Sequence, residues 1–191
     1  ALEAVMAHAK EAGAEEFWNL GDMVGYGPFP DACVKALQGL CRWHVFGNHD
    51  EKVLSRKKIE RMKEKGKDPD KIFSFEWTNR HLSEEAMEFI RALPPVQPVD
   101  VSGHPVLITH GSPEGPEDGL TPQTPSARLE ELAKMTDATL VLCGHTHFPF
   151  DRTAGGIRFV NPGGAGRSFD GDPRASYCLI DIAPAGFDVR H

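Results

Sequence analysis

Short apolar runs alternate with polar clusters along this chain. Residues 17–20, 43–46, 105–109 and 139–143 are four such runs, each of strand length and each followed by polar residues beside a glycine. The longer segments between them carry apolar residues at helical spacing, for example Val34, Leu37 and Leu40 after Pro30. Strands that alternate with helices in this way predict a sheet built mostly from parallel strands.

Two further segments show helical periodicity. Residues 2–11 place Leu2, Val5, Met6 and Ala9 on one face, and Gly13 ends that helix. A helix is also predicted from about residue 126 to 135, with Thr124 as its N-cap. Each of these helices has an apolar face that can pack on a sheet.

Residues 51–93 are predicted to form a helical excursion from the sheet that covers one side of the domain. Charged residues dominate its first half, where Gly66 and Pro69 interrupt any long helix. A later helix begins at Ser83, a good N-cap residue, and ends before Pro94 and Pro95.

Three more strands are predicted at residues 157–160, 176–182 and 187–189, with turn-rich connections that favour antiparallel pairing. The chain has no repeat, low-complexity tract or linker. We therefore predict a single domain over residues 1–191, of the α/β class in its α+β sandwich form, with mixed β-sheets flanked by helices.

The composition fits a globular domain and excludes several classes. With 191 residues and 40% hydrophobic residues, the chain can bury a sizeable core, and its net charge of −7 argues against bulk attraction to nucleic acid or anionic membrane. No apolar run approaches the roughly 20 residues that cross a bilayer. No basic and apolar leader is visible. The four cysteines form no CxxC pair and favour buried free thiols. Together these features predict a soluble cytoplasmic protein.

Polar side chains gather at the ends of the four strands described first. In chain order they are Asp22, Asn48, His49, Asp50, His110, His145 and His147. In open α/β sheets ligands bind at the carboxyl ends of strands, because the loops there converge on one crevice. Carboxylate, amide and imidazole groups without thiolate suit a hard or borderline divalent cation. Two such ions about 3.5–4 Å apart can hold a hydroxide for in-line attack on phosphorus.

Each of these motifs has an ordinary interpretation when taken alone. Gly-Asp is usually a turn, Asn-His-Asp is usually a polar loop, and Gly-His-Thr-His can hold a single structural metal. Their occurrence in this order, each at a strand end, favours the metal site. The remaining histidines stand apart from the cluster and are assigned ordinary surface or core roles: His8, His44, His81, His104 and His191.

The motifs together resemble those of the calcineurin-like metallophosphoesterase superfamily. They are Gly21-Asp22, Gly47-Asn48-His49-Asp50, His110-Gly111 and Gly144-His145-Thr146-His147. The flanking residues 20–28 and 160–164 narrow the resemblance to its small prokaryotic phosphodiesterase branch, and the resemblance covers nearly the whole chain. It implies a four-layer architecture.

The resemblance also implies a role for each residue. Asp22 would bridge two metal ions. Asn48, His110 and His145 would complete the ligands of the second ion. His147 would bind the first ion. His49 would stabilise the substrate phosphate and protonate the leaving oxygen, a task that suits imidazole near neutral pH. Asp50 would orient the His49 ring.

One motif of the family is absent from this sequence. The Asp-x-His at the end of an initial strand, which supplies two ligands to the first ion, would precede a helix that resembles residues 1–11. We expect the natural protein to carry that strand and motif upstream of Ala1. The intact mass of the natural product tests this expectation, and 21.0 kDa would contradict it.

The leading hypothesis is therefore a metal-dependent phosphoesterase, most readily a phosphodiesterase, with two divalent ions such as manganese, iron, nickel or zinc. The alternative is a catalytically incomplete binding scaffold of the same fold, since the same branch includes a eukaryotic trafficking-coat subunit. His49 favours the enzyme, because a scaffold needs no proton donor. An unrelated protein with one structural zinc would have to explain four separate strand-end motifs.

The substrate class is left open by the motifs. A phosphate-ester small molecule or nucleotide is favoured over nucleic acid, and no membrane partner is expected. The basic segment of residues 56–71 either grips a polyanionic substrate or forms a solvated helical face, and the interleaved Glu60 and Glu64 favour the face. Arg152 and Arg167 lie near the last strand ends and reach either a phosphate or surface partners.

Overall fold

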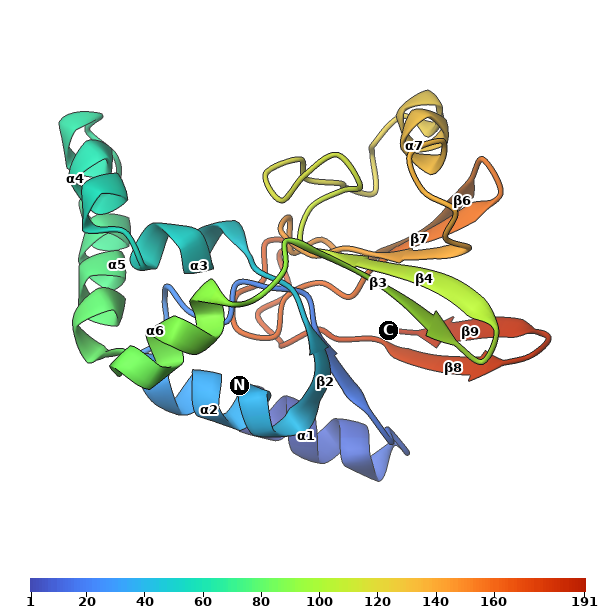
Figure 1. Cartoon of the computed structure of the whole chain (residues 1–191), viewed down its shortest axis with the longest axis horizontal. Coiled ribbons are helices and arrows are strands. Elements are labelled where there is room, and N and C mark those ends of the chain that lie inside the picture. Colours follow the sequence, from blue (N-terminus) through green and yellow to red (C-terminus); the bar gives the residue numbers. More distant parts are fainter.

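The computed structural model describes all 191 residues as a sheet sandwich with helices outside it (Figure 1). The helices are α1 (Leu2–Glu11), α2 (Pro30–Leu40), α3 (Asn48–Val53), α4 (Arg56–Glu64), α5 (Pro69–His81), α6 (Glu84–Arg91) and α7 (Ser126–Ala133). The strands are β1 (Phe17–Asn19), β2 (Cys41–His44), β3 (Val96–Val101), β4 (His104–Thr109), β5 (Leu140–Leu142), β6 (Phe150–Ala154), β7 (Ile157–Asn161), β8 (Leu179–Ala183) and β9 (Gly186–Arg190).

The largest sheet has five strands in the order β3-β4-β5-β7-β6. Its three inner strands run parallel, and its two edge strands pair antiparallel to their neighbours. β1 and β2 form a separate parallel pair, and β8 and β9 form an antiparallel hairpin. This is the mixed α/β architecture that the sequence predicts.

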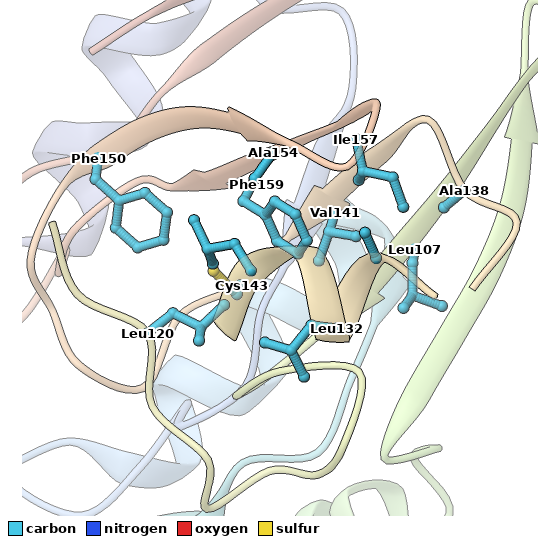
Figure 2. Close-up of a cluster of buried hydrophobic side chains, with 12 residues drawn as sticks. Leu107, Leu120, Leu132, Ala138, Val141, Cys143, Phe150, Ala154, Ile157 and Phe159 are labelled. Atoms are coloured by element: carbon cyan, nitrogen blue, oxygen red, sulfur yellow. The ribbon is translucent and has the colours of Figure 1, made fainter. Parts of the chain in front are cut away.

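Side chains of the central strand β5 alternate between two cores. Val141 and Cys143 point into a cluster beneath α7, which Figure 2 shows with Phe150 and Phe159. Leu140 and Leu142 point to the opposite face, into a cluster covered by residues of β1, β2, β8 and β9 such as Trp18 and Ile180. Because successive strand residues face opposite sides, one short apolar run serves both layers.

Four helices, α3 to α6, fill the segment between β2 and β3 and have a core of their own. Phe75 and Ile90 are fully buried there. Ser83 caps α6 by accepting a hydrogen bond from the backbone N–H of Ala86. This helical region lies at one end of the molecule, beside the ends of β1 and β2 (Figure 1).

Three details of the sequence prediction are wrong. Strands β3 and β6 were not expected. β7 pairs parallel with β5 and antiparallel with β6, so only β8 and β9 form the antiparallel pair expected at the end of the chain. Thr124 does not cap α7, because its hydroxyl accepts a hydrogen bond from Thr121 in the preceding turn and Pro125 occupies the N-cap.

All four cysteines are free thiols, and only Cys143 is fully buried, so the expectation that the cysteines are buried holds for this one alone. None of the helices combines the length and the apolar character that a bilayer crossing requires.

Candidate metal centre

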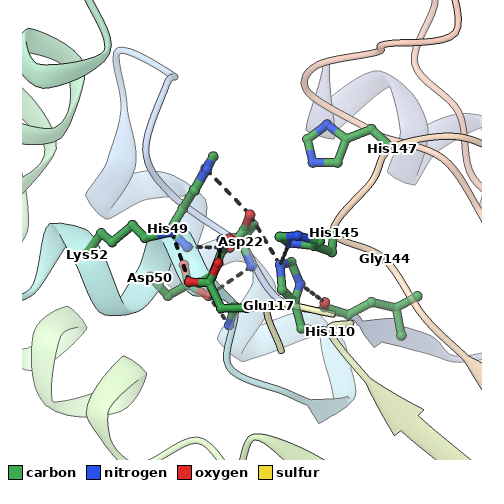
Figure 3. A network of polar contacts seen from close by, with 12 residues as sticks. Asp22, His49, Asp50, Lys52, His110, Glu117, Gly144, His145 and His147 are labelled. Carbon is green, nitrogen blue, oxygen red and sulfur yellow. Dashed lines mark hydrogen bonds and ion pairs between the residues drawn. The ribbon is translucent and has the colours of Figure 1, made fainter. Parts of the chain in front are cut away.

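Four strand ends from two sheets meet at one point of the molecule (Figure 3). Asp22 follows β1, Asn48 and His49 follow β2, His110 follows β4, and His145 follows β5. Asp22 Oδ2 lies 3.4 Å from His110 Nε2 and 3.5 Å from His49 Nδ1. His110 Nε2 in turn lies 3.3 Å from His145 Nδ1. Direct side-chain contacts thus join four of the seven predicted site residues, Asp22, His49, His110 and His145.

His147 stands at the rim of this group. It makes no hydrogen bond to the other predicted ligands, and Figure 3 shows it above His145 and apart from Asp22. Its Nδ1–H donates to the backbone carbonyl of Arg167 at 2.6 Å, which leaves Nε2 as an acceptor. The ring therefore presents a lone pair of the kind that binds a metal ion.

His110 is fixed in the same way. Its Nδ1 lies 2.7 Å from the carbonyl oxygen of Leu20, and a carbonyl can only accept, so the proton is on Nδ1. Nε2 then faces Asp22 and His145, and the Asp22 carboxylate favours a proton on it, which a metal ion bound at Nε2 would replace. A backbone partner on the far ring nitrogen is the arrangement that orients histidine ligands in metal sites.

Backbone strain is concentrated in the same residues. Only four residues other than glycine have positive φ, and three of them are Asp22 (53°), His145 (64°) and His147 (60°). Non-glycine residues in the left-handed region cost of order 1–3 kcal/mol each and persist where the surroundings impose them. Here the imposed conformation turns three polar side chains toward one crevice.

Asn48 supplies the clearest test of whether these residues fit a metal ion. Its Nδ2 donates to Glu117 Oε2 at 3.1 Å, while its Oδ1 is buried and has no hydrogen-bond partner. An unpaired buried acceptor costs about 1–3 kcal/mol, and a cation beside it would remove that cost. No three His, Cys, Asp or Glu side chains are close enough to form a ligand set by themselves. The residues present therefore fit a divalent ion by the chemistry of their donor atoms, carboxylate, amide oxygen and imidazole, and not by their spacing in this structure.

Burial and neighbouring charges set the protonation of the central groups. Burial opposes ionisation of Asp22, but the hydrogen bond with His110 and the two nearby imidazoles outweigh it and lower the pKa of Asp22 to about 2. Burial lowers the pKa of His49 to about 4, so this ring is neutral at pH 7. Burial also lowers the pKa of His145 and of His147. Burial opposes protonation of His110 as well, but its hydrogen bond with Asp22 and the charge of that carboxylate outweigh burial and raise the pKa of His110. An ionised carboxylate and neutral imidazoles are the forms that bind metal ions.

The predicted contact between the side chains of Asp50 and His49 is not found in the structure. The Asp50 carboxylate accepts hydrogen bonds from the backbone N–H groups of Asp22, Gly47 and Val24, at 2.9, 3.0 and 3.3 Å, and makes none to His49. As the third residue of α3 it reaches back to the N-cap residue, as in a capping box. Asp50 therefore ties the ends of β1 and β2 together, although burial raises its pKa.

His49 is positioned by two aromatic rings that the sequence motifs did not indicate. The rings of Tyr26 and Phe75 each lie 5.1 Å from its ring in edge-to-face contacts. Its backbone N–H donates to Asp22 Oδ1 at 2.7 Å. Tyr26 follows the Gly-Asp motif closely, whereas Phe75 belongs to α5 and has no motif near it.

Glu117 and Lys52 were also missed. Glu117 accepts the hydrogen bond from Asn48 and forms an ion pair with Lys52 at 3.0 Å, so it holds the amide with Oδ1 turned away from it. Beside Asn48 and Glu117 lies a cavity of about 490 Å³ with apolar walls, including Phe46 and Leu54, and a second carboxylate, Glu51. Glu117 stands in a loop whose sequence has no regular spacing, so its position at the site could be recognised only from the folded structure.

The segment Asn161-Pro162-Gly163-Gly164 supports the loop that carries His145. Asn161 Nδ2 donates to the carbonyl of Gly144 at 2.7 Å and to the hydroxyl of Thr146 at 3.2 Å. Its Oδ1 accepts from the backbone of Gly163. One buried amide thus joins the two loops that present His145 and the Gly163 turn.

Comparison with known proteins places the chain in a family. Residues 1–184 match the model of the calcineurin-like phosphoesterase superfamily domain. An uncharacterized protein of Methanocaldococcus jannaschii is 29% identical over 198 residues, with 95% of this chain and 77% of that protein covered.

Two solved structures are also similar. A metallophosphoesterase from Sphaerobacter thermophilus has a TM-score of 0.75 and 29% identity, over 93% of this chain and 77% of that one. A hypothetical protein from Pyrococcus horikoshii has a TM-score of 0.83 and 22% identity, over 100% of this chain and 79% of that one, which supports the fold alone. The family match spans most of the sequence and contains every strand end described above. The chain therefore belongs to the calcineurin-like phosphoesterase superfamily, a family of hydrolases whose fold implies divalent metal ions.

Proposed function

We propose that this protein is a metal-dependent phosphodiesterase whose site binds two divalent ions. The observation that carries the proposal is the buried Oδ1 of Asn48, which has no hydrogen-bond partner. It is supported by the contacts that join Asp22 to His110 and His110 to His145. A set made of Asp22, Asn48, His110 and His145 matches the preference of manganese, iron, nickel or zinc for mixed oxygen and nitrogen ligands.

Each residue has one assignment. Asp22 would bind both ions. Asn48, His110 and His145 would hold the second ion, and His147 would contribute to the first. When bound, the ions activate a water molecule and neutralise charge that develops on the phosphate.

His49 is assigned to the leaving group. At neutral pH its uncharged ring can donate an N–H hydrogen bond to a phosphate oxygen, and the negative charge of a bound phosphate raises its pKa toward the protonated form. Protonation of the leaving oxygen is the step in which such a ring accelerates ester cleavage. Tyr26 and Phe75 pack edge to face against the ring and hold it at the site.

The proposal is tested by measuring metal content and activity on the same protein samples. After dialysis with manganese, elemental analysis gives the number of ions for each chain. Hydrolysis is then followed with bis-p-nitrophenyl phosphate as the diester and p-nitrophenyl phosphate as the monoester. Asn48→Ala and His145→Ala should lose the second ion and the activity together, whereas His81→Ala, an exposed histidine outside the site, serves as the matched control.

The two readouts separate the alternatives. A higher rate on the diester, lost in the Asn48 and His145 variants, supports the proposal. Bound metal without hydrolysis of either ester would contradict it and would favour a binding module. Unchanged metal content in Asn48→Ala would contradict the ligand set even if hydrolysis occurs.

A further inference from the structure

Two cationic side chains converge on the Tyr26 ring next to the proposed site. The Lys71 ammonium lies 5.9 Å from the ring centroid, and the Arg167 guanidinium carbon lies 4.2 Å from it. Lys71 comes from α5 and Arg167 from the loop after β7, nearly a hundred residues apart in the chain. The Tyr26 ring itself contacts His49, so both cations are one aromatic ring away from the proposed proton donor.

These two cations lack the acidic partners that several other basic residues have. In the preceding basic segment Lys58 pairs with Glu51, and Lys63 pairs with Glu76. Arg158 forms an ion pair with Asp151, and Arg152 donates to the backbone carbonyl of Pro122. Lys71 and Arg167 take part in no ion pair and no side-chain hydrogen bond. Their charges are therefore available to a ligand.

Arg167 is attached to the site by its backbone and its side chain. Its carbonyl accepts the Nδ1–H of His147, and its guanidinium lies between the Tyr26 ring and the Phe169 ring, 4.9 Å from the latter. Phe169 stacks on His147 at 5.1 Å and is 48% exposed. A planar guanidinium held between two rings keeps its edge free to bind phosphate oxygens in a bidentate manner.

The cavity beside Asn48 offers no comparable free cation. Its arginine, Arg91, pairs with Glu84, and its carboxylates Glu51 and Glu117 pair with Lys58 and Lys52. The unpaired positive charge next to His49 is therefore that of Lys71 and Arg167. Together with Tyr26 and Phe169 they form a surface that we name the cationic rim.

We propose that the cationic rim is a subsite for a second phosphate group of the substrate, adjacent to the phosphodiester that is cleaved. The inference rests on the function proposed above and narrows its substrate class. The preferred substrates are then nucleotide-type diesters that carry a neighbouring phosphate, with Lys71 and Arg167 binding that phosphate. Residues 56–65 of the basic segment are assigned no part, because the cations that lie over the Tyr26 ring are Lys71 and Arg167, and Lys58 and Lys63 are already paired.

Two chromogenic substrates that differ by one phosphate provide the test. Thymidine 5′-(p-nitrophenyl phosphate) is compared with the same compound carrying a 3′-phosphate, and release of p-nitrophenolate is measured at fixed ionic strength. We expect the 3′-phosphate to lower KM about tenfold, the effect of one charge-assisted contact. Arg167→Ala and Lys71→Ala should each remove most of this preference, and Arg167→Lys should retain part of it because the charge remains.

Lys57→Ala is the matched control. Lys57 is an exposed lysine of α4 without an ion pair, and its removal should leave the preference for the 3′-phosphate unchanged. A tenfold preference that Arg167→Ala retains would overturn the proposal. So would equal KM values for the two substrates in the unaltered protein.

Calorimetry separates this subsite from the proposed activity. Thymidine 3′,5′-bisphosphate and thymidine 5′-monophosphate are titrated into the manganese-loaded protein and into Arg167→Ala. Tighter binding of the bisphosphate that depends on Arg167 supports the subsite even if neither ester is hydrolysed, in which case the proposed function fails alone. Hydrolysis together with equal binding of both nucleotides would overturn the subsite and leave the proposed function standing.

Discussion

The two sheets that meet at the site hold their functional residues in different ways. Strands β4 and β5 lie inside the five-stranded sheet, and their apolar residues are buried almost throughout. The loops that follow them are joined by backbone hydrogen bonds, such as Gly144 N–H to the His110 carbonyl at 2.8 Å. Strands β1 and β2 are a short, half-buried pair, and the loops that follow them depend on the Asp50 carboxylate.

This difference implies that substitutions beside the ends of β1 and β2 disturb the site more than substitutions beside the ends of β4 and β5. On the β4–β5 side, the backbone ladder positions His110 and His145, and side chains such as Asn161 reinforce it. On the β1–β2 side, one buried carboxylate and one closely packed glycine position Asp22 and Asn48. Buried polar groups that depend on a single partner lose the most when that partner is removed. The predictions below rely on this contrast.

The largest effect is expected from Gly47→Ala. A Cβ at Gly47 would overlap the backbone nitrogen and Oδ1 of Asp22, so the end of β1 must move. A shift of about 1 Å at such a site can lower activity roughly 100-fold, and loss of Asp22 as a proposed ligand would lower it further. Metal content measured by elemental analysis should fall together with diester hydrolysis.

Gly144→Ala is the matched change on the other side. The nearest atom to a Cβ there is the carbonyl oxygen of Leu20 at 3.4 Å, an ordinary contact. This variant should keep its metal and most of its activity. If both variants lose metal equally, the contrast between the two sides is wrong.

His49→Ala should separate rate from metal content. The ring is not an assigned ligand, so elemental analysis should give the same result as for the unaltered protein. The rate of diester hydrolysis should fall about 10²–10⁴-fold, the range for a general acid. His145→Ala, from the other sheet, should instead lose metal, and an equal loss of metal in His49→Ala would refute the role assigned to His49.

Asp50→Asn tests whether this residue holds the backbone or orients His49. An asparagine keeps the size but replaces one acceptor oxygen by an NH₂ group, which faces the buried N–H groups of Asp22, Gly47 and Val24. We expect the free energy of unfolding to fall by about 2–3 kcal/mol in urea titration, since charge-assisted hydrogen bonds are lost. Unchanged stability with slower turnover would instead favour the orienting role.

The position of a residue at a strand end could be predicted well from the sequence. A contact between two residues that are neighbours in the sequence could not. Asp22, Asn48, His110 and His145 follow apolar runs directly, and the carboxyl ends of those runs converge. Asp50 follows His49, and this proximity suggested a contact between their side chains. Because both lie in α3, consecutive side chains diverge by about 100° and cannot face each other.

The missed strands have a physical reason as well. β3 contains Pro98, and a proline within an apolar run lowers the expectation of a strand, although it is tolerated at the edge that β3 occupies. β6, with Asp151 and Arg152, is a polar edge strand with two buried residues at its ends. Phe75 and Glu117 reach the site only through tertiary packing, so no local pattern could indicate them.

Glu117→Gln should give the smallest effect and the finest test of the β1–β2 side. The amide keeps the size of the side chain but weakens the charge-assisted hydrogen bond from Asn48 Nδ2 and removes the ion pair with Lys52. Partners of this kind typically change metal affinity about 10–100-fold, and the exposure of Glu117 places the expected loss at the lower end. Competition with a chelator should therefore show about tenfold weaker manganese binding, whereas Glu114→Gln, in the same loop but without a contact to Asn48, should show none. If the two variants bind manganese equally, the amide of Asn48 is held without Glu117, and the β1–β2 side depends on Asp50 and Gly47 alone.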